Sequence, residues 1–337
     1  MLASPGPPFV DAPARLPSTT VPAVTDARPV VLHAGSLAAR TNGERAQGTP
    51  GDDTRMLPNL LIIGAQKCGT SALHHYLALH PDIFMAEEKE LNFFVETKNW
   101  TKGREWYESK FPPQARILGE SSPYYTNYPF MKGVPERIRS MIPDAKLIYM
   151  VRDPIERIIS QYMHNRAGRE TRPLAKALRA PATGGLDGTP YILRSKYYMQ
   201  IEQYLNWFPA SSLLIITHED LLQRRRETLR NVFRFLGVDE TYESEDFSRL
   251  IHESRAKKTK NRLGLALTRN PPRGILRSLP PLVREPAERL LRSVLITRKI
   301  EKPTMDAALR SELADLLRDD IDRFRKFTGR PFAEWSV

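Results

Sequence analysis

Short apolar runs alternate with helical patterns from residue 57 to about residue 240. The runs are bounded by Gly, Pro, Asn or charged residues, which is typical of buried strands. We therefore expect strands over Asn59–Ile63, Ile83–Met85, Ile117–Gly119, Lys146–Val151 and Ser212–Thr217. Between the strands, apolar residues recur at helical spacing. They predict helices over Thr70–Leu79, Gly103–Phe111, Val134–Met141, Ile155–Ala167, Ser195–Phe208 and Leu221–Leu236. This alternation predicts an α/β fold of three layers, with a central parallel sheet flanked by helices.

The two ends of the chain depart from this pattern. Residues 1–56 are rich in Pro, Ala, Gly and Thr, have no hydrophobic period, and predict a disordered tail. Met305–Thr328 predicts an amphipathic helix. Its apolar face would consist of Leu309, Leu313, Leu316, Leu317, Ile321 and Phe324. We therefore expect residues 57–337 to form one domain with a basic, helical C-terminal part.

Positive charge is concentrated near the C-terminus. The net charge of the 337 residues is +12, and Ile251–Ile300 alone holds thirteen Lys or Arg against three Glu, a net charge of +10. Such a stretch is either an ordinary solvated surface or a site for an anionic substrate, a nucleotide, nucleic acid or an acidic membrane.

Composition also limits compartment and chemistry. The single cysteine, Cys68, excludes an intramolecular disulfide and any multi-cysteine metal site. No apolar run approaches the roughly 18–20 residues that span a bilayer. The start of the sequence lacks the basic and apolar regions of a signal peptide. We therefore expect a cytoplasmic protein without a transmembrane segment.

The first candidate site is the stretch LLIIGAQKCGTSALHHYL, Leu60–Leu77. Backbone N–H groups at a glycine turn and at the start of the next helix bind anions. In the usual triphosphate loop, G-x-x-x-x-G-K-[ST], the lysine follows the second glycine. Here Lys67 stands two residues before Gly69, so its ammonium is expected to curl over the anion. An ordinary strand–turn–helix connection remains the alternative. The candidate phosphate contacts are Gly64, Gln66, Lys67, Cys68, Gly69, Thr70 and Ser71.

A second candidate site follows in YMVRDPIERIISQY. Arg152 stands at the tip of a predicted strand, and Ser160 lies eight residues later, about two turns into a helix. Ligands bind at strand tips in such sheets, and arginine offers paired donors to a phosphate. A local ion pair between Arg152 and Asp153 is the alternative. Two anion sites at strand tips suggest a ligand with phosphates at two distant positions.

The paired motifs resemble those of the superfamily of sulfotransferases that depend on 3′-phosphoadenosine 5′-phosphosulfate (PAPS). The resemblance covers roughly Leu57 to Arg262. It implies a P-loop-like fold and PAPS as the donor, with no metal. It further implies that the first loop holds the 5′-phosphosulfate, and that Arg152 and Ser160 hold the 3′-phosphate. The acceptor would be a small molecule or a glycan, and no nucleic-acid partner is expected.

KELNFF and GESSPYY resemble the heparan sulfate N- and 3-O-sulfotransferases and their bacterial relatives. This resemblance implies that Glu90 is the catalytic base, whereas the related aryl and steroid enzymes use histidine. A carboxylate can take the proton of an attacking hydroxyl. Lys67 would stabilise the charge of the leaving 3′,5′-bisphosphoadenosine. From its neighbours alone, Glu90 would be an ordinary solvated acid. The nearby His74, His75 and His80 are expected to be surface, packing or helix-end residues.

The sequence departs from that branch at three positions. Ser121 stands where the relatives have a lysine, which Lys89 would replace. Asn92 stands where the 3-O-sulfotransferases often have histidine, and Val95 where an acid is common. These changes favour a bacterial relative with a different acceptor. The candidate acceptor contacts are Lys89, Asn92, Ser121 and Tyr124. The set Tyr124, Tyr125 and Tyr128 would line the acceptor cleft or belong to the core.

A basic loop, HESRAKKTKNRLG, falls where the family closes over the nucleotide. Lys258, Lys260 and Arg262 are therefore candidate phosphate contacts, with solvated surface cations as the alternative. The leading interpretation is sulfuryl transfer to a hydroxyl or amine of a carbohydrate, glycolipid or secondary metabolite. The alternatives are a P-loop ATP-dependent kinase and a basic protein that binds nucleic acid or a membrane surface. Against the kinase, Lys67 is misplaced, and Asp153 at its strand tip stands beside Arg152, which suits a phosphate better than a metal. The sequence names neither the acceptor nor the oligomeric state.

Overall fold

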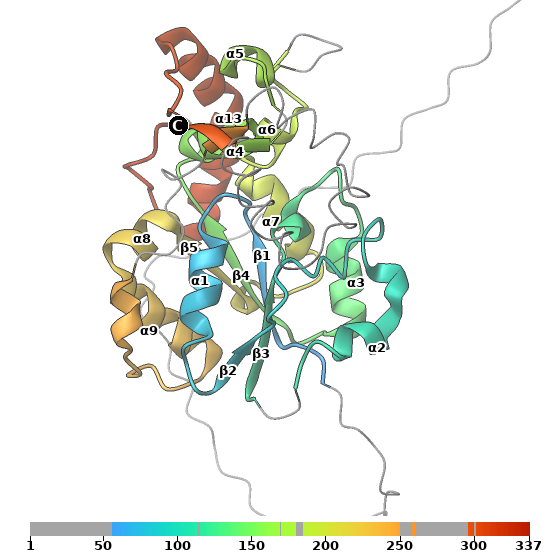
Figure 1. Ribbon diagram of the computed structural model, residues 1–337. Coiled ribbons are helices and arrows are strands. Elements are labelled where there is room, and N and C mark those ends of the chain that lie inside the picture. The colour runs from blue at the N-terminus through green and yellow to red at the C-terminus, as the bar shows by residue number, and fades with distance from the viewer. Residues whose placement is uncertain are drawn as a thin grey trace, which may run out of the picture. The chain divides into compact units, whose positions relative to one another are not determined.

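The computed structural model describes residues 56–112, 115–168, 170–179, 185–249, 258–260, 296–299 and 301–337 (Figure 1). The expected tail, apart from Met56, and most of the basic stretch lie outside these residues. All described residues belong to the compact unit from Asp53 to Val337. Within these ranges, no helix is both long and apolar enough to cross a membrane.

Five parallel strands form the central sheet, in the order β2-β3-β1-β4-β5. Their bounds are Leu60–Gly64 for β1, Ile83–Met85 for β2, Ile117–Ser121 for β3, Lys146–Val151 for β4 and Leu213–Thr217 for β5. In the register, Leu60 pairs with Gly119 on one side and with Lys146 on the other. Strand β1 is buried along its whole length, as a strand between two layers of helices must be. The predicted strands and the predicted parallel α/β architecture are confirmed.

Helices cover both faces of the sheet. Figure 1 shows α1 and α9 on one side of the strands and α2 and α3 on the other. The helices are α1 Thr70–Leu77, α2 Gly103–Glu108, α3 Val134–Met141, α4 Pro154–Gly168, α5 Leu174–Ala177, α6 Pro190–Leu193, α7 Tyr197–Leu205, α8 His218–Gln223, α9 Arg225–Leu236 and α13 Ala307–Thr328. Short 3-10 helices are η1 Trp100–Lys102, η2 Pro123–Thr126, η3 Ala210–Ser212 and η4 Glu245–Ser248. A separate antiparallel pair is formed by β6 Lys258–Lys260 and β7 Ile296–Lys299.

The predicted single helix over Leu221–Leu236 is wrong. The chain forms α8 and α9 instead, with a break at Arg224, where φ is −127° and ψ is 43°. Thr217 starts α8 early, because its hydroxyl accepts the backbone N–H of Asp220 at 2.9 Å. The turn between the helices lets both α8 and α9 bury apolar residues in the same core, among them Leu221 and Leu229.

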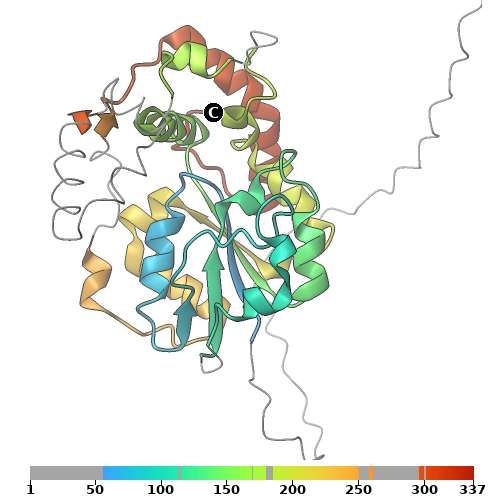
Figure 2. The ribbon, with the colours of Figure 1, turned by 45° about the vertical axis from the view of Figure 1, so that its right-hand side comes forward.

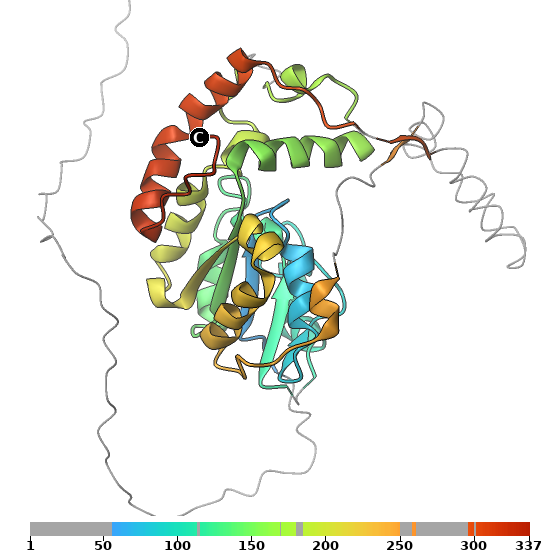
Figure 3. The ribbon, with the colours of Figure 1, turned by 90° about the vertical axis from the view of Figure 1, so that its left-hand side faces the viewer.

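Helix α13 confirms the predicted amphipathic helix near the C-terminus. Leu309, Leu313, Leu317, Ile321 and Phe324 are buried on one face, and α13 contacts α7 and α4. Figure 3 shows α13 and α4 beyond the carboxyl ends of the strands of the sheet. The Asp320 carboxylate accepts the backbone N–H groups of Tyr198 and Met199, at 2.9 and 2.8 Å. A negative charge at the first turn of α7 is favourable, so this contact fixes α7 against α13.

Asp153 joins the start of α4 to the C-terminal segment. Its Oδ1 accepts the backbone N–H of Glu156 at 2.8 Å, as an N-cap does. Its Oδ2 accepts the backbone N–H and the hydroxyl of Ser336, at 2.5 and 2.7 Å. Both carboxylate oxygens of Asp153 are therefore used to hold structure together.

Replacing Asp153 by alanine is expected to lower the free energy of unfolding by about 2–4 kcal/mol, because a cap and two hydrogen bonds to a charged group are lost. The matched control is Asp187→Ala, since the Asp187 side chain is 66% exposed and its ion pair is with Lys196. That change is expected to cost less than about 1 kcal/mol. Urea unfolding of both variants measures the difference. Equal stabilities of the two variants would contradict this role of Asp153.

Candidate active site

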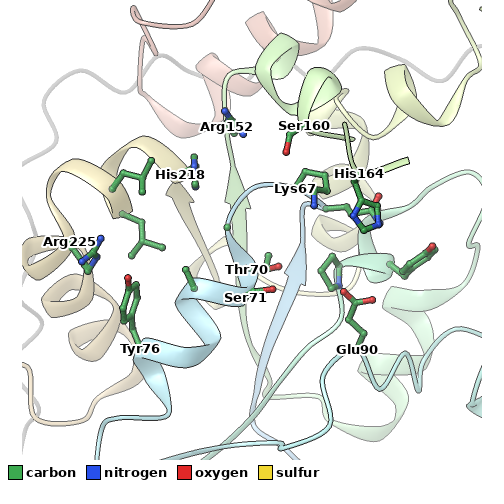
Figure 4. A pocket seen from close by; sticks show the side chains of 17 residues that line it. Lys67, Thr70, Ser71, Tyr76, Glu90, Arg152, Ser160, His164, His218 and Arg225 are labelled. Atoms are coloured by element: carbon green, nitrogen blue, oxygen red, sulfur yellow. The ribbon is translucent and has the colours of Figure 1, made fainter. Parts of the chain in front are cut away.

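A cavity of about 310 Å³ lies at the carboxyl edge of the sheet, where the two anion motifs meet. Figure 4 shows Lys67, Thr70, Ser71 and Glu90 around this cavity, together with Arg152 and Ser160. The β1–α1 loop, the loop after β2, the tip of β4, η2 and helices α1, α4, α8 and α9 all contribute walls. The lining residues are Gln66, Lys67, Gly69, Thr70, Ser71, Ala72, Tyr76, Glu90, Pro123, Tyr124, Arg152, Ser160, His164, His218, Leu221, Leu222 and Arg225.

Two glycines allow the loop between β1 and α1 to take its path. At Gly64, an added Cβ would lie 1.8 Å from the hydroxyl oxygen of Thr126. At Gly69, φ is +93° and an added Cβ would lie 2.7 Å from Nδ1 of His218. Positive φ and close approach both favour glycine. Gly69 precedes the first residue of α1, so the N–H groups of this helix start lie at the cavity wall.

Two arginines, the buried Arg157 and the half-buried Arg194, support the loop from behind. Arg157, fully buried on α4, donates to the hydroxyl of Ser195 at 2.5 Å and also contacts the backbone oxygen of Gln66 at 3.5 Å. Arg194 donates to the side-chain oxygen of Gln66 at 2.7 Å, and burial lowers the pKa of its guanidinium to about 10. The Gln66 side chain is thus held by protein partners. Sequence reasoning missed both arginines, although a charge among the apolar positions of α4 was a signal for Arg157.

The thiol of Cys68 points away from the cavity. It is buried within 3.8 Å of the hydroxyl of Tyr197, and burial raises its pKa to about 11. The backbone N–H of Cys68 donates to the carbonyl of Ala65 at 3.2 Å. The Cys68 side chain therefore does not line the cavity, and Cys68 contributes only to the shape of the loop. Gly64 also lies outside the cavity lining.

Glu90 faces the cavity from the loop after β2. Its backbone N–H donates to the carbonyl of Ser121 at 3.1 Å, which ties this loop to the end of β3. The ammonium of the preceding Lys89 donates to the hydroxyl of Ser71. Burial lowers the pKa of Lys89, and the charge of Glu90 opposes that shift. The pair Lys89–Ser71 thus connects the Glu90 loop to the first turn of α1.

The other candidate acceptor contacts divide between cavity and scaffold. Tyr124 lines the cavity, and its ring lies 5.5 Å from the guanidinium of Arg194. Asn92 instead donates to the backbone oxygen of Glu90 at 2.6 Å, which holds the loop itself. Ser121 is buried outside the lining, and its hydroxyl has no hydrogen-bond partner among the described residues.

Of the three tyrosines after β3, Tyr124 alone lines this cavity, whereas Tyr125 and Tyr128 both border a second groove. Tyr125 is in the core, where its hydroxyl donates to Glu120 at 2.5 Å. Tyr128 lines the second groove, which has a volume of about 240 Å³.

Arg152 and Ser160 lie at one end of the cavity. A nitrogen of Arg152 lies 3.3 Å from the carboxylate of Glu156, one turn into α4. The alternative ion pair with Asp153 does not form, since Ser336 and Glu156 occupy that carboxylate. Ser160 is buried on α4 and still reaches the cavity wall.

His74, His75 and His80 were expected to be surface, packing or helix-end residues, and two of them are buried. His74 is buried and its pKa is lowered to about 4, chiefly by burial. His80 is buried and contacts the backbone oxygen of Asp239 at 3.0 Å. Two other histidines, His164 and His218, line the cavity and were missed. Burial, followed by the charge of Arg152, lowers the pKa of His218 to about 4, so this ring is neutral at physiological pH.

The remaining candidates come from the basic loop. Lys258 and Lys260 belong to β6, which contacts α4, and Figure 2 shows this strand near one end of that helix. Arg262 lies outside the described residues. Within the described part of the chain, no group of three His, Cys, Asp or Glu residues could hold a metal ion.

Comparison with known proteins agrees with this geometry. The family model described as "Sulfotransferase domain" matches residues 57–274. Heparan sulfate glucosamine 3-O-sulfotransferase 6 of Mus musculus is 32% identical over 253 residues, which cover 73% of this chain and 69% of the relative. Bifunctional heparan sulfate N-deacetylase/N-sulfotransferase 4 of Mus musculus is 33% identical over 202 residues, 55% of this chain. The matched part spans only 23% of that longer relative.

A solved structure shares the fold. The sulfotransferase from Alicyclobacillus acidocaldarius superposes with a TM-score of 0.58 and is 24% identical, covering 84% of this chain and all of its own. The family model covers more than half of the chain and includes both anion motifs and Glu90. The chain therefore belongs to the sulfotransferase domain family and is related to its heparan sulfate N- and 3-O-sulfotransferase branch.

Proposed function

We propose that the protein transfers the sulfuryl group of PAPS to a hydroxyl or amine of a carbohydrate, glycolipid or secondary metabolite. One observation carries the proposal: a single cavity is lined by the Lys67 loop, by Arg152 with Ser160, and by Glu90. We assign the catalytic unit to residues 57–337. The location in the cytoplasm stays a prediction.

The walls of the cavity suit the parts of PAPS. The loop N–H groups, Lys67, Thr70 and Ser71 suit the phosphosulfate, because they combine helix-start donors with a cation. Arg152 and Ser160 suit the 3′-phosphate. The wall away from these residues is formed by Tyr76, Leu221, Leu222 and Arg225, and its aromatic ring, two leucines and guanidinium suit the adenine base. There the Arg225 guanidinium lies 4.9 Å from the ring of Tyr76.

Glu90 is proposed to act as the general base. PAPS supplies an activated sulfuryl group. As in phosphoryl transfer, the acceptor must attack in line and lose its own proton as the new bond forms. A carboxylate at the cavity wall can accept the proton of the attacking hydroxyl or amine. Lys67 stabilises charge on the bridging oxygen as the bond to sulfur breaks. The relatives have a lysine at the position of Ser121. Lys89, whose ammonium donates to Ser71, would take the place of that lysine.

The kinase alternative loses support at Asp153. A magnesium ligand must present free carboxylate oxygens, and both oxygens of Asp153 hold Glu156 and Ser336. Lys67 also stands before Gly69 rather than after it. The heparan sulfate enzymes among the relatives support a carbohydrate acceptor. The departures at Ser121 and Asn92 support an acceptor other than heparan sulfate.

Calorimetric titration tests the donor site. We expect micromolar binding of 3′,5′-bisphosphoadenosine and much weaker binding of ATP with magnesium. Arg152→Ala should weaken binding of the bisphosphate by about 10- to 100-fold, since a charge-assisted hydrogen bond is lost. The matched control, Arg318→Ala, removes a half-exposed arginine that pairs with Asp315 on α13, and should leave binding unchanged. A preference for ATP with magnesium, or no nucleotide binding, would refute the proposal.

A further inference from the structure

Glu156 contacts two cations at the Arg152 end of the cavity. One carboxylate oxygen lies 3.3 Å from Arg152, and the ammonium of Lys302 donates to both oxygens, at 2.7 and 2.9 Å. We propose that Glu156 is a positioning residue for Arg152, and that Lys302 neutralises Glu156 so that Arg152 stays available to the 3′-phosphate of the donor. This inference rests on the proposed function, because it concerns the same nucleotide.

The contact of Glu156 with Arg152 is partly buried, and its contact with Lys302 joins distant segments of the chain. Glu156 lies in the first turn of α4, four residues after Arg152, and these side chains are only 29% and 20% exposed. Charges that are partly buried are screened less by salt than exposed ones. Lys302 comes from the segment between β7 and α13, far along the chain. The contact therefore ties the C-terminal part of the protein to the Arg152 end of the cavity.

Other groups near Arg152 do not replace Glu156. His218 is neutral at physiological pH, since its pKa is about 4. Glu219 accepts the backbone N–H of Asp153 at 3.2 Å and interacts electrostatically with Arg152, but no oxygen of Glu219 forms an ion pair with Arg152. Among the described residues, Glu156 is the one carboxylate paired with Arg152.

A phosphate and a carboxylate are both anions, so they compete for Arg152. Arginine has five N–H donors, and the contact with Glu156 leaves most of them for a phosphate. With Lys302 bound, the Glu156 carboxylate is shared between two cations and orients Arg152 without neutralising it. Without Lys302, Glu156 would pair more strongly with Arg152 and would also repel the incoming phosphate.

Nucleotides that differ in the 3′-phosphate test this role. Calorimetry would give the dissociation constants of 3′,5′-bisphosphoadenosine and adenosine 5′-phosphate for the wild type, Lys302→Gln, Glu156→Gln and the double variant. Lys302→Gln should weaken binding of the bisphosphate by about fivefold, as expected for a partly exposed charge pair, and leave adenosine 5′-phosphate unchanged. In the Glu156→Gln background, Lys302→Gln should change neither constant. The matched control is Lys326→Gln, on the exposed face of α13.

Three results would overturn the inference. Equal weakening of both nucleotides would show that Lys302 does not act on the 3′-phosphate. The same loss in the Glu156→Gln background would show that Lys302 acts without Glu156. No effect of Lys302→Gln would show that the contact is unimportant. If the wild type binds 3′,5′-bisphosphoadenosine, each of these results overturns only this inference. If the wild type does not bind 3′,5′-bisphosphoadenosine, the proposed function is overturned as well.

Discussion

Replacing Lys67 by alanine is expected to weaken binding of 3′,5′-bisphosphoadenosine by about 100-fold and to lower sulfuryl transfer by about 1000-fold or more. Lys67 is the lysine of the anion-binding loop, and it lines the cavity beside Thr70 and Ser71. Its charge should matter most when the bond to sulfur breaks, because negative charge then grows on the leaving nucleotide. The loss in transfer should therefore exceed the loss in binding. Calorimetry and transfer of labelled sulfate from PAPS measure the two effects.

Two controls accompany the Lys67 variant. Lys176→Ala removes an exposed lysine from α5 and should change neither binding nor transfer. Lys67→Arg keeps the charge but changes its shape and reach, and it should restore binding only in part. Unchanged nucleotide affinity in Lys67→Ala would remove the central residue of the proposed donor site.

Replacing Glu90 by glutamine is expected to lower sulfuryl transfer by about 100- to 10,000-fold while nucleotide binding stays within about twofold. Glutamine has nearly the same shape as glutamate but cannot accept the proton of the acceptor. The loop that carries Glu90 is held by Ser121, Asn92 and the Lys89–Ser71 contact, so its conformation should survive the change. Transfer would be measured on whichever acceptor the wild type labels in a panel of desulfated heparan sulfate, amino sugars and simple phenols.

Glu87→Gln is the matched control for Glu90→Gln. Glu87 lies in the same acidic stretch, is exposed, and is not part of the cavity wall. Its replacement should leave transfer unchanged. Full activity of Glu90→Gln, measured with the same acceptor, would exclude Glu90 as the base. Loss of nucleotide binding together with transfer would instead indicate that the loop had lost its structure.

Local patterns were sufficient for most of the secondary structure. Lys146–Val151 and Val134–Met141 were predicted with the bounds that the structure shows, because continuous apolar runs and helical periodicity are properties of neighbouring residues. The helix predicted over Leu221–Leu236 failed at Arg224. Thr217 caps α8 early and a turn at Arg224 separates α8 from α9, and the apolar periodicity of the segment contains neither feature.

The sequence by itself determined the anion-binding loop, the strand tip with Arg152, the order of strands and helices along the chain, and the resemblance that implied PAPS. Each motif and each element depends on residues close together in the chain. Only the tertiary structure decided that the thiol of Cys68 turns into the core and that Arg194 holds Gln66, 128 residues away. It also decided that Asp153 is used by Ser336, 183 residues away, and is not free for a metal. Such contacts require distant segments to meet in space, and a side chain's partners follow from that packing rather than from its neighbours in sequence.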